Sequence, residues 1–137
     1  MLRPDITLDY LNARSADRLP GHYGFEVTSF DEGRLAAQIE LQPWMMAPNG
    51  FLHAATVILL ADTSAGYATI AHLPEGASNF TTIELKSNFL GTAKGGVLRA
   101  EAVAEHLGRN TQVWSATVFN DQGKKTALFR CTQMILR

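Results

Sequence analysis

Residues 23–41 alternate between apolar and polar types with the period of a β-strand. Phe25, Val27 and Ser29 share one face of a first strand, and Asp31-Glu32-Gly33 supplies a turn. The alternation then continues through a second set of apolar positions, Leu35, Ala37, Ile39 and Leu41. The pattern predicts a β-hairpin in this part of the chain.

The helical pattern appears in two places. A short helix is predicted near Thr7 to Arg14, and Pro20-Gly21 is expected to end that region. From His53 onward the segment Ala54 to Leu73 is apolar on nearly every side and too long for a strand, which predicts a helix covered all round by protein. Its length approaches that of a membrane span, but Asp62, Thr63, Ser64 and His72 interrupt it, so we expect no membrane insertion.

Beyond residue 76 the whole chain has a strand-like pattern, broken by turns rich in glycine and asparagine. Four strands are predicted, at about 79–90, 96–107, 111–120 and 124–136. Strands that follow one another through hairpins favour antiparallel pairing. The element order predicts an α+β fold in which a six-stranded, largely antiparallel sheet wraps around one long central helix. With no repeat or linker, residues 1–137 are expected to form a single domain.

Charge and composition narrow the classes of partner. The net charge of -1 comes from scattered residues, without a basic run, so nucleic acid is not an expected partner. The histidines, His22, His53, His72 and His106, are too widely separated to suggest a metal site. A phosphate loop and a dinucleotide fingerprint are both missing, so no nucleotide cofactor is expected. The lone Cys131 and the lack of an apolar leader favour the cytoplasm.

Asp62 is the most unusual residue, because it lies near the middle of the apolar helix. An ionised carboxylate buried without partners costs several kcal/mol or takes on a raised pKa. Two structural explanations stand beside a catalytic one: Asp62 caps a second short helix, or it pairs with a Lys or Arg from the sheet. Sequence periodicity gives the catalytic explanation only a small advantage.

His53 lies where the loop Pro48-Asn49-Gly50 meets the helix, and the free N–H groups of a helix start can bind an oxyanion. We expect His53 to orient this loop rather than to transfer protons. His53 and Asp62 are nine residues apart, which on a helix means about 13 Å along the axis and roughly opposite faces. If both serve one site, that site must be shared between two copies of the chain, which predicts an obligate dimer.

The segment Asn49-Gly50-Phe51-Leu52-His53-Ala54-Ala55, followed by Leu60-Ala61-Asp62-Thr63-Ser64-Ala65-Gly66, resembles the motif of hotdog-fold acyl-CoA thioesterases of the phenylacetic-acid-degradation and 4-hydroxybenzoyl-CoA thioesterase type. Later segments, Phe89-Leu90, Lys94-Gly95-Gly96, Leu107-Gly108-Arg109 and the end of the chain, are also similar. The resemblance implies a hotdog fold, a homodimer or homotetramer, and hydrolysis of an acyl- or aroyl-CoA. Coenzyme A is part of that substrate, and no separate cofactor is implied.

The resemblance also implies residue roles. Asp62 would act as general base on water or as nucleophile through a mixed anhydride. The backbone N–H of Ala54 would polarise the carbonyl, with Gly50 and His53 shaping its loop. Thr82 would position the attacking water, although threonine is also simply favoured in strands. Asn49, Phe89, Arg109 and Asn110 are assigned to substrate and coenzyme A binding. A guanidinium such as that of Arg109 suits a phosphate, and a plain turn with a solvated charge is the alternative. Phe89, like Phe51 and Phe80, suits an aromatic acyl group and is equally plausible as a core residue.

The chain departs from the motif at two points. Ala54 and Ala55 replace two glycines, which keeps the N–H donor and adds a methyl group beside the carbonyl. Ala47 stands where many relatives have Asn or Gln. These departures motivate a second hypothesis, an acyl-CoA-binding protein without turnover. Hydratase chemistry is a third hypothesis, because hotdog proteins also support it.

Overall fold

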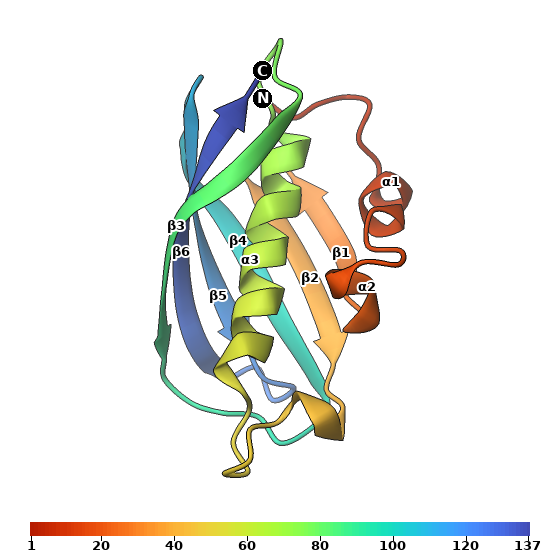
Figure 1. Ribbon diagram of the computed structural model, residues 1–137, viewed down its shortest axis with the longest axis vertical. Helices are drawn as coiled ribbons and strands as arrows, with labels where there is room; N and C mark the ends of the chain where they lie inside the picture. The colour runs from red at the N-terminus through yellow and green to blue at the C-terminus, as the bar shows by residue number, and fades with distance from the viewer.

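The computed structural model describes every residue from Met1 to Arg137 and contains a single sheet of six strands in the order β1-β2-β4-β5-β6-β3 (Figure 1). All neighbouring strands pair antiparallel. The strands are β1 Glu26–Asp31, β2 Arg34–Glu40, β3 Asn79–Phe89, β4 Val97–Leu107, β5 Thr111–Phe119 and β6 Lys125–Leu136. The predicted hotdog architecture is therefore confirmed, and the four later strands lie within about a residue of their predicted limits.

Helix α3, Ala54–Ala71, lies across the concave face of this sheet (Figure 1). It is long and apolar enough to cross a membrane by length and composition, but 72% of it is buried inside the protein. The expectation that it is covered all round is wrong in its N-terminal half. There Ala54 and Ala55 are exposed, while Ile58, Asp62 and Thr63 are half-buried. Because these positions are spaced three or four residues apart, they form one uncovered stripe along the helix.

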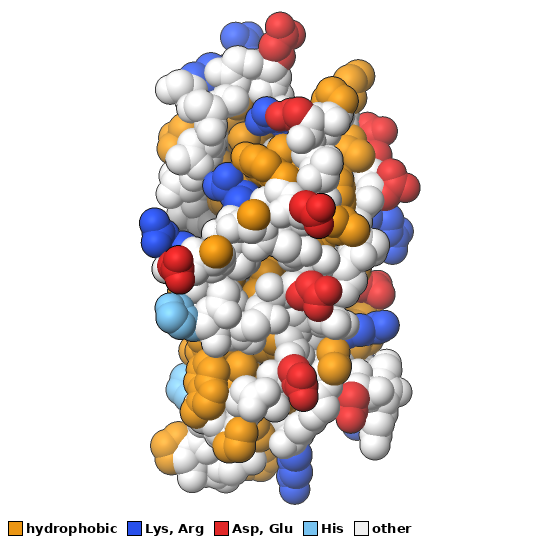
Figure 2. All heavy atoms as spheres, turned by 90° about the vertical axis from the view of Figure 1, so that its right-hand side faces the viewer, with side chains coloured by type: hydrophobic (Ala, Val, Ile, Leu, Met, Phe, Trp, Pro, Cys, Tyr) orange, Lys and Arg blue, Asp and Glu red, His pale blue; other side chains and the backbone are white.

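Short elements cover the other side of the molecule: α1 Leu8–Ala13, α2 Leu19–His22 and η1 Pro43–Met45. The Thr7 hydroxyl caps α1 by accepting the Tyr10 N–H at 3.1 Å. Pro20 does not end the helical region as predicted, because it occupies the first turn of α2, where its missing N–H costs nothing. On this face basic and acidic side chains are interspersed, and no region carries a single sign of charge (Figure 2).

The predicted alternation of β1 fails beyond Val27. A β-bulge between Val27 and Ser29 shifts the register against β2. As a result Ser29 is exposed, whereas Phe30 packs against the core. A bulge inserts one extra residue into a strand and so reverses the faces that follow it, which no period-two pattern detects.

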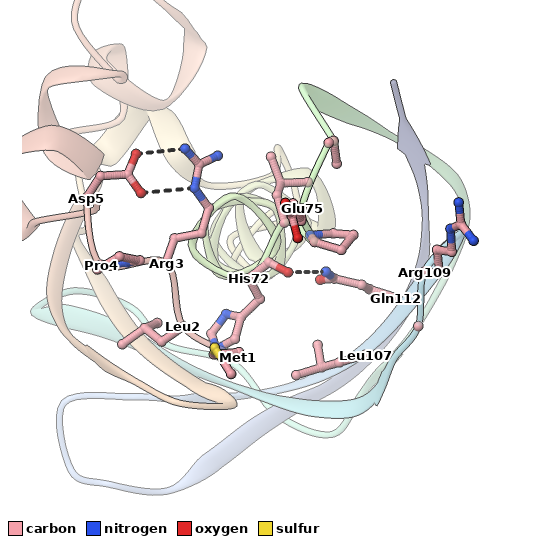
Figure 3. Close-up of a pocket in the computed structure, with 15 residues that line it drawn as sticks. Met1, Leu2, Arg3, Pro4, Asp5, His72, Glu75, Leu107, Arg109 and Gln112 are labelled. Atoms are coloured by element: carbon pink, nitrogen blue, oxygen red, sulfur yellow. Dashed lines mark hydrogen bonds and ion pairs between the residues drawn. The ribbon is translucent and has the colours of Figure 1, made fainter.

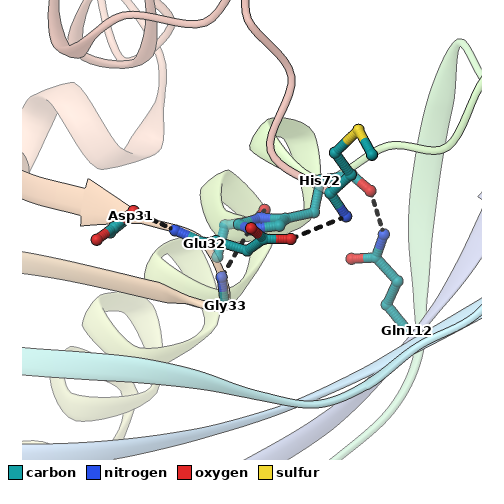
Figure 4. A network of polar contacts seen from close by, with 7 residues as sticks. Asp31, Glu32, Gly33, His72 and Gln112 are labelled. Atoms are coloured by element: carbon teal, nitrogen blue, oxygen red, sulfur yellow. Dashed lines mark hydrogen bonds and ion pairs between the residues drawn. The ribbon is translucent and has the colours of Figure 1, made fainter.

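A buried polar network anchors the C-terminal end of α3 (Figure 4). His72 Nε2 accepts the Gly33 N–H at 2.8 Å, and its Nδ1 donates to the Ala68 carbonyl at 2.7 Å. Gln112 Nε2 donates to the His72 carbonyl at 2.8 Å, and Gln112 Oε1 accepts the Trp114 indole N–H at 3.0 Å. These bonds fix the imidazole as the neutral tautomer, and burial lowers the pKa of His72.

This network predicts a pH-dependent stability. Because the pKa of His72 is lowered in the folded state, the unfolded chain binds a proton first, near pH 6.5. The contribution of His72 is therefore complete above pH 6.5 and is lost as the pH falls toward the lowered folded value, by up to about 1.4 kcal/mol per pH unit. Urea unfolding at pH 7.5 and pH 5.0 checks this. His72→Gln should be less stable at pH 7.5 and lose less on acidification, and an equal loss in both proteins would contradict the expectation.

Candidate active site

The first turn of α3 leaves a single backbone amide without a partner. His53 is the N-cap, and its Nδ1 accepts the Ala55 N–H at 2.9 Å. The His53 carbonyl accepts the N–H groups of Thr56 at 3.0 Å and Val57 at 3.4 Å. The Ala54 N–H has no acceptor in the protein. Because it lies at the positive end of the helix dipole, it is available to an oxygen of a ligand.

The loop before the helix is held by its own hydrogen bonds. Gly50 has a φ of 88°, which strongly favours glycine, and its N–H donates to the Ala47 carbonyl at 2.9 Å. Asn49 Oδ1 accepts the Phe51 N–H at 3.2 Å, and Thr92 Oγ1 accepts the Leu52 N–H at 3.0 Å. Every other amide between Gly50 and the helix is thus used, and the loop holds the start of α3 in a defined position.

A cavity of about 280 Å³ opens at the start of α3, where Ala54 lines it. Its lining comes from the loop, the helix start and the end of β3, namely Phe51, Leu52, Ala54, Val57, Phe89, Gly91 and Thr92. Phe51 and Phe89 are 58% and 48% exposed in the single chain. The cavity is mainly apolar, so it is suited to a hydrocarbon part of a ligand rather than to a charged group.

Asp62 lies on the uncovered stripe of α3, two turns beyond the helix start. Its Oδ1 is buried and has no hydrogen-bond partner, and no Lys, Arg or His forms an ion pair with it. It also lies in the interior of α3, where it caps no helix. Both structural explanations are therefore excluded. Burial raises the pKa of Asp62, as is common for carboxylates that accept protons in catalysis.

Thr82 lies on β3, half-buried, and its hydroxyl donates to Gln133 Oε1 at 2.7 Å. Gln133 is fully buried on β6 and was missed as a functional candidate. It occupies a core-facing position between Cys131 and Ile135, and a polar side chain in that register is the sequence signal that marks it. Thr92 lines the cavity and accepts the Leu52 N–H, but nothing in the sequence marks it as a functional candidate.

Arg109 and Asn110 lie at the other end of α3, in the turn between β4 and β5. Arg109 lines a cavity of about 670 Å³ together with His72 and Gln112 (Figure 3). Arg137 supports this turn by donating to the Arg109 carbonyl at 2.9 Å and to Asn110 Oδ1 at 3.3 Å. Within one chain these residues are therefore separated from the Ala54 cavity by the length of the helix.

Comparisons with known proteins agree with this architecture. A family model described as thioesterase superfamily matches residues 49–127. The chain is 28% identical over 109 residues to the 1,4-dihydroxy-2-naphthoyl-CoA hydrolase of Listeria monocytogenes, covering 80% of this chain and 88% of that protein. It is 29% identical over 132 residues to the proofreading thioesterase EntH of Klebsiella pneumoniae, covering 96% of each.

The structural likeness is equally extensive. The crystal structure of a mutant thioesterase from Pseudomonas aeruginosa superposes with a TM-score of 0.92 at 27% identity, over 98% of this chain and 97% of that one. The family model alone spans more than half of the chain. The chain therefore belongs to the thioesterase superfamily and is a thioester hydrolase with the hotdog fold.

Proposed function

We propose that this protein hydrolyses acyl- or aroyl-CoA thioesters as a homodimer, with Asp62 of one protomer and the partner's Ala54 N–H acting on the same carbonyl. The observation that carries the proposal is the pair of unsatisfied groups on α3. Asp62 has a buried oxygen without a partner, and Ala54 has the single unpaired amide of the helix start. Buried polar groups are normally hydrogen-bonded, so the Asp62 oxygen favours a site that is completed by a ligand, and the exposed Ala54 N–H is open to such a ligand.

The spacing of the two groups supports a shared site. Ala54 and Asp62 are eight residues apart, or about 12 Å along the helix axis, too far for one carbonyl group to contact both. β3 forms an edge of the sheet and exposes apolar side chains, with Ile83, Leu85 and Phe89 at 53%, 40% and 48%. An edge strand of this kind tends to pair with another strand. Pairing of β3 with a second copy would bring the uncovered stripes of two α3 helices together.

The chemistry follows from these positions. The Ala54 amide polarises the thioester carbonyl and stabilises the oxyanion that forms. Asp62 removes a proton from water as the water oxygen bonds to the carbonyl carbon. Collapse of the tetrahedral intermediate breaks the carbon–sulfur bond, and the departing thiolate takes the proton held by Asp62. The products are the free acid and coenzyme A, and Asp62 returns to the carboxylate. Burial raises the pKa of Asp62, which makes its carboxylate a better proton acceptor.

The substrate assignment has two supports. The apolar cavity beside Ala54, between Phe51 and Phe89, suits a hydrocarbon or aromatic acyl group. The Listeria relative is by name a hydrolase of an aromatic acyl-CoA. Arg109 and Asn110 remain predictions for the phosphates of coenzyme A. The reaction as proposed needs water and the chain's own residues, without a separate cofactor. A reducing cytoplasm suits the lone Cys131, which is buried and free.

Thiol release from a panel of short, medium, long and aromatic acyl-CoA thioesters tests the activity. We expect hydrolysis of at least one class, and we expect Asp62→Asn to lower kcat by at least about 100-fold, because general-base catalysis contributes that much. Asn has the same shape but cannot take up a proton, so substrate binding should persist. Full activity in Asp62→Asn, or binding without turnover in the wild type, would refute the proposal.

The acid limb of the pH–rate profile is a separate test. A general base works only when deprotonated, so activity is present above the pKa of Asp62 and is lost as the pH falls through it. Burial raises this pKa, so the limb in kcat/KM should lie above the ordinary aspartate value of about 3.9. Rates measured from pH 4 to pH 8 would show it. An activity that stays constant down to pH 4 would exclude Asp62 as a base with a raised pKa.

Ala54→Pro removes the proposed oxyanion donor while preserving the helix. Proline is favoured at the first helical position, and His53 already has the extended conformation that a residue before proline needs. We expect a fall in kcat of about 100-fold or more, with little change in melting temperature. Ala54→Gly, which keeps the N–H, should stay far more active than Ala54→Pro. Equal activity of the two variants would exclude a role for the amide.

Mixing the two inactive variants tests whether the site is shared. A dimer of one Asp62→Asn chain and one Ala54→Pro chain contains one site with both functional groups intact. After random exchange of equal amounts, about a quarter of wild-type activity should return. If Asp62 and Ala54 acted within one chain, mixing would restore nothing.

A further inference from the structure

Three side chains, Thr82, Gln133 and Cys131, form a hydrogen-bonded chain across β3 and β6. Thr82 Oγ1 donates to Gln133 Oε1 at 2.7 Å, and Gln133 Nε2 donates to Cys131 Sγ at 3.4 Å. Gln133 and Cys131 are completely buried, whereas Thr82 lies at the boundary with the site. An amide oxygen can only accept a hydrogen bond, so the hydrogen of the Thr82 hydroxyl is used in the bond to Gln133. The Thr82 oxygen therefore faces away from β6 with its lone pairs.

Thr82 on β3 lies at the same height as Asp62 on the neighbouring helix α3. A Cβ on Gly66 would lie 3.1 Å from Phe80 Cζ, which fixes where α3 meets β3. The two elements run in opposite directions (Figure 1). Asp62 precedes Gly66 by one turn, about 6 Å, on the same face of the helix. Thr82 follows Phe80 by two residues, about 6.6 Å, on the same face of the strand.

The electrostatics of Cys131 agree with this placement of Asp62. The pKa of the Cys131 thiol is raised to about 12 by burial, then by the charge of Asp62 and that of Glu84. Cys131 is thus neutral at any working pH. Glu84 accepts the Thr132 hydroxyl at 3.0 Å. Asp62, Glu84 and Cys131 are the titratable groups associated with this region.

Asp62 and Thr82 therefore present two hydrogen-bond acceptors to one space. Two acceptors cannot bond each other, which agrees with the missing partner of Asp62 Oδ1. A water molecule can donate one hydrogen to each acceptor and keep a lone pair free for attack.

We propose that Gln133 is a positioning residue: it fixes the Thr82 hydroxyl as an acceptor, so that Thr82 and Asp62 together hold the attacking water. The inference rests on the proposed hydrolysis. One hydrogen of the water passes to Asp62 and then to the departing thiolate. The other remains hydrogen-bonded to Thr82 Oγ1 during attack and leaves with the acid product.

Gln133→Met tests this role in the full-length protein. Without Gln133 Oε1, the Thr82 hydroxyl is free to turn and donate to the Asp62 carboxylate, which stabilises the charged form. We expect kcat to fall about tenfold with little change in KM. We also expect the acid limb of the pH–rate profile to move down by about one pH unit. Thr82→Val should lower kcat similarly without moving the limb downward, because it supplies no donor.

Gln112→Met is the matched control, because Gln112 is a buried glutamine that pairs in register with Gln133 on the adjacent strand. The Gln112 amide donates to the His72 carbonyl and not to the Thr82 chain. Gln112→Met should therefore be less stable, and its kcat and the acid limb of its pH–rate profile should stay those of the wild type. An unchanged kcat and limb in Gln133→Met would overturn the inference, as would the same kcat loss in Gln112→Met. If Gln133→Met does not fold, full kcat in Thr82→Val overturns it.

The proposed function is tested separately. Thiol release by the wild type and its loss in Asp62→Asn establish hydrolysis whatever the Gln133 variant does. If the wild type does not hydrolyse any thioester of the panel, the proposed function itself fails. A hydrolysing wild type with an unaffected Gln133→Met variant refutes only the positioning role.

Discussion

A single curved sheet can cover only part of the circumference of a helix, and α3 is apolar on nearly every side. In one chain the C-terminal half of α3 is fully enclosed, while the N-terminal half keeps an uncovered stripe with Ala54, Ile58 and Asp62. The same side of the molecule ends in the unpaired edge of β3. Apolar surface of this kind is removed from water when a second surface covers it. On the proposed dimer, the contact that completes the core would also complete the site.

The two ends of α3 differ in how completely their backbone groups are hydrogen-bonded. At the C-terminal end the carbonyl of His72 and its imidazole are hydrogen-bonded to Gln112, Gly33 and Ala68. At the N-terminal end His53 satisfies most of the first turn and leaves one amide free. One end of the helix is thus hydrogen-bonded to the rest of the chain, and the other leaves one donor that a ligand oxygen can use.

Much of the fold was predictable because alternation is a local signal. The limits of the four later strands follow from the sequence almost to the residue, since turns bound all four and β4, β5 and β6 each have one face in the core. The bulge after Val27 was not predictable, because it depends on pairing with β2. Nor was the uncovered stripe of α3. Periodicity identifies apolar residues, but which of them remain uncovered depends on where the sheet ends.

Only part of the candidate site can be predicted from the sequence. Asp62 was detectable because a carboxylate in an apolar helix conflicts with its surroundings, and the structure removed the capping and ion-pair explanations. The Ala54 side chain gives no signal in the sequence. Its backbone amide is identified only in the structure, because the neighbouring amides are hydrogen-bonded and this one is not. The substitution of alanines for the two glycines of the motif fits this account, since the donor is the backbone. Alanine orders a helix better than glycine by about 1 kcal/mol. Its methyl group occupies part of the cavity shared with Phe51 and Phe89, so the firmer helix start comes with a narrower approach for the acyl group.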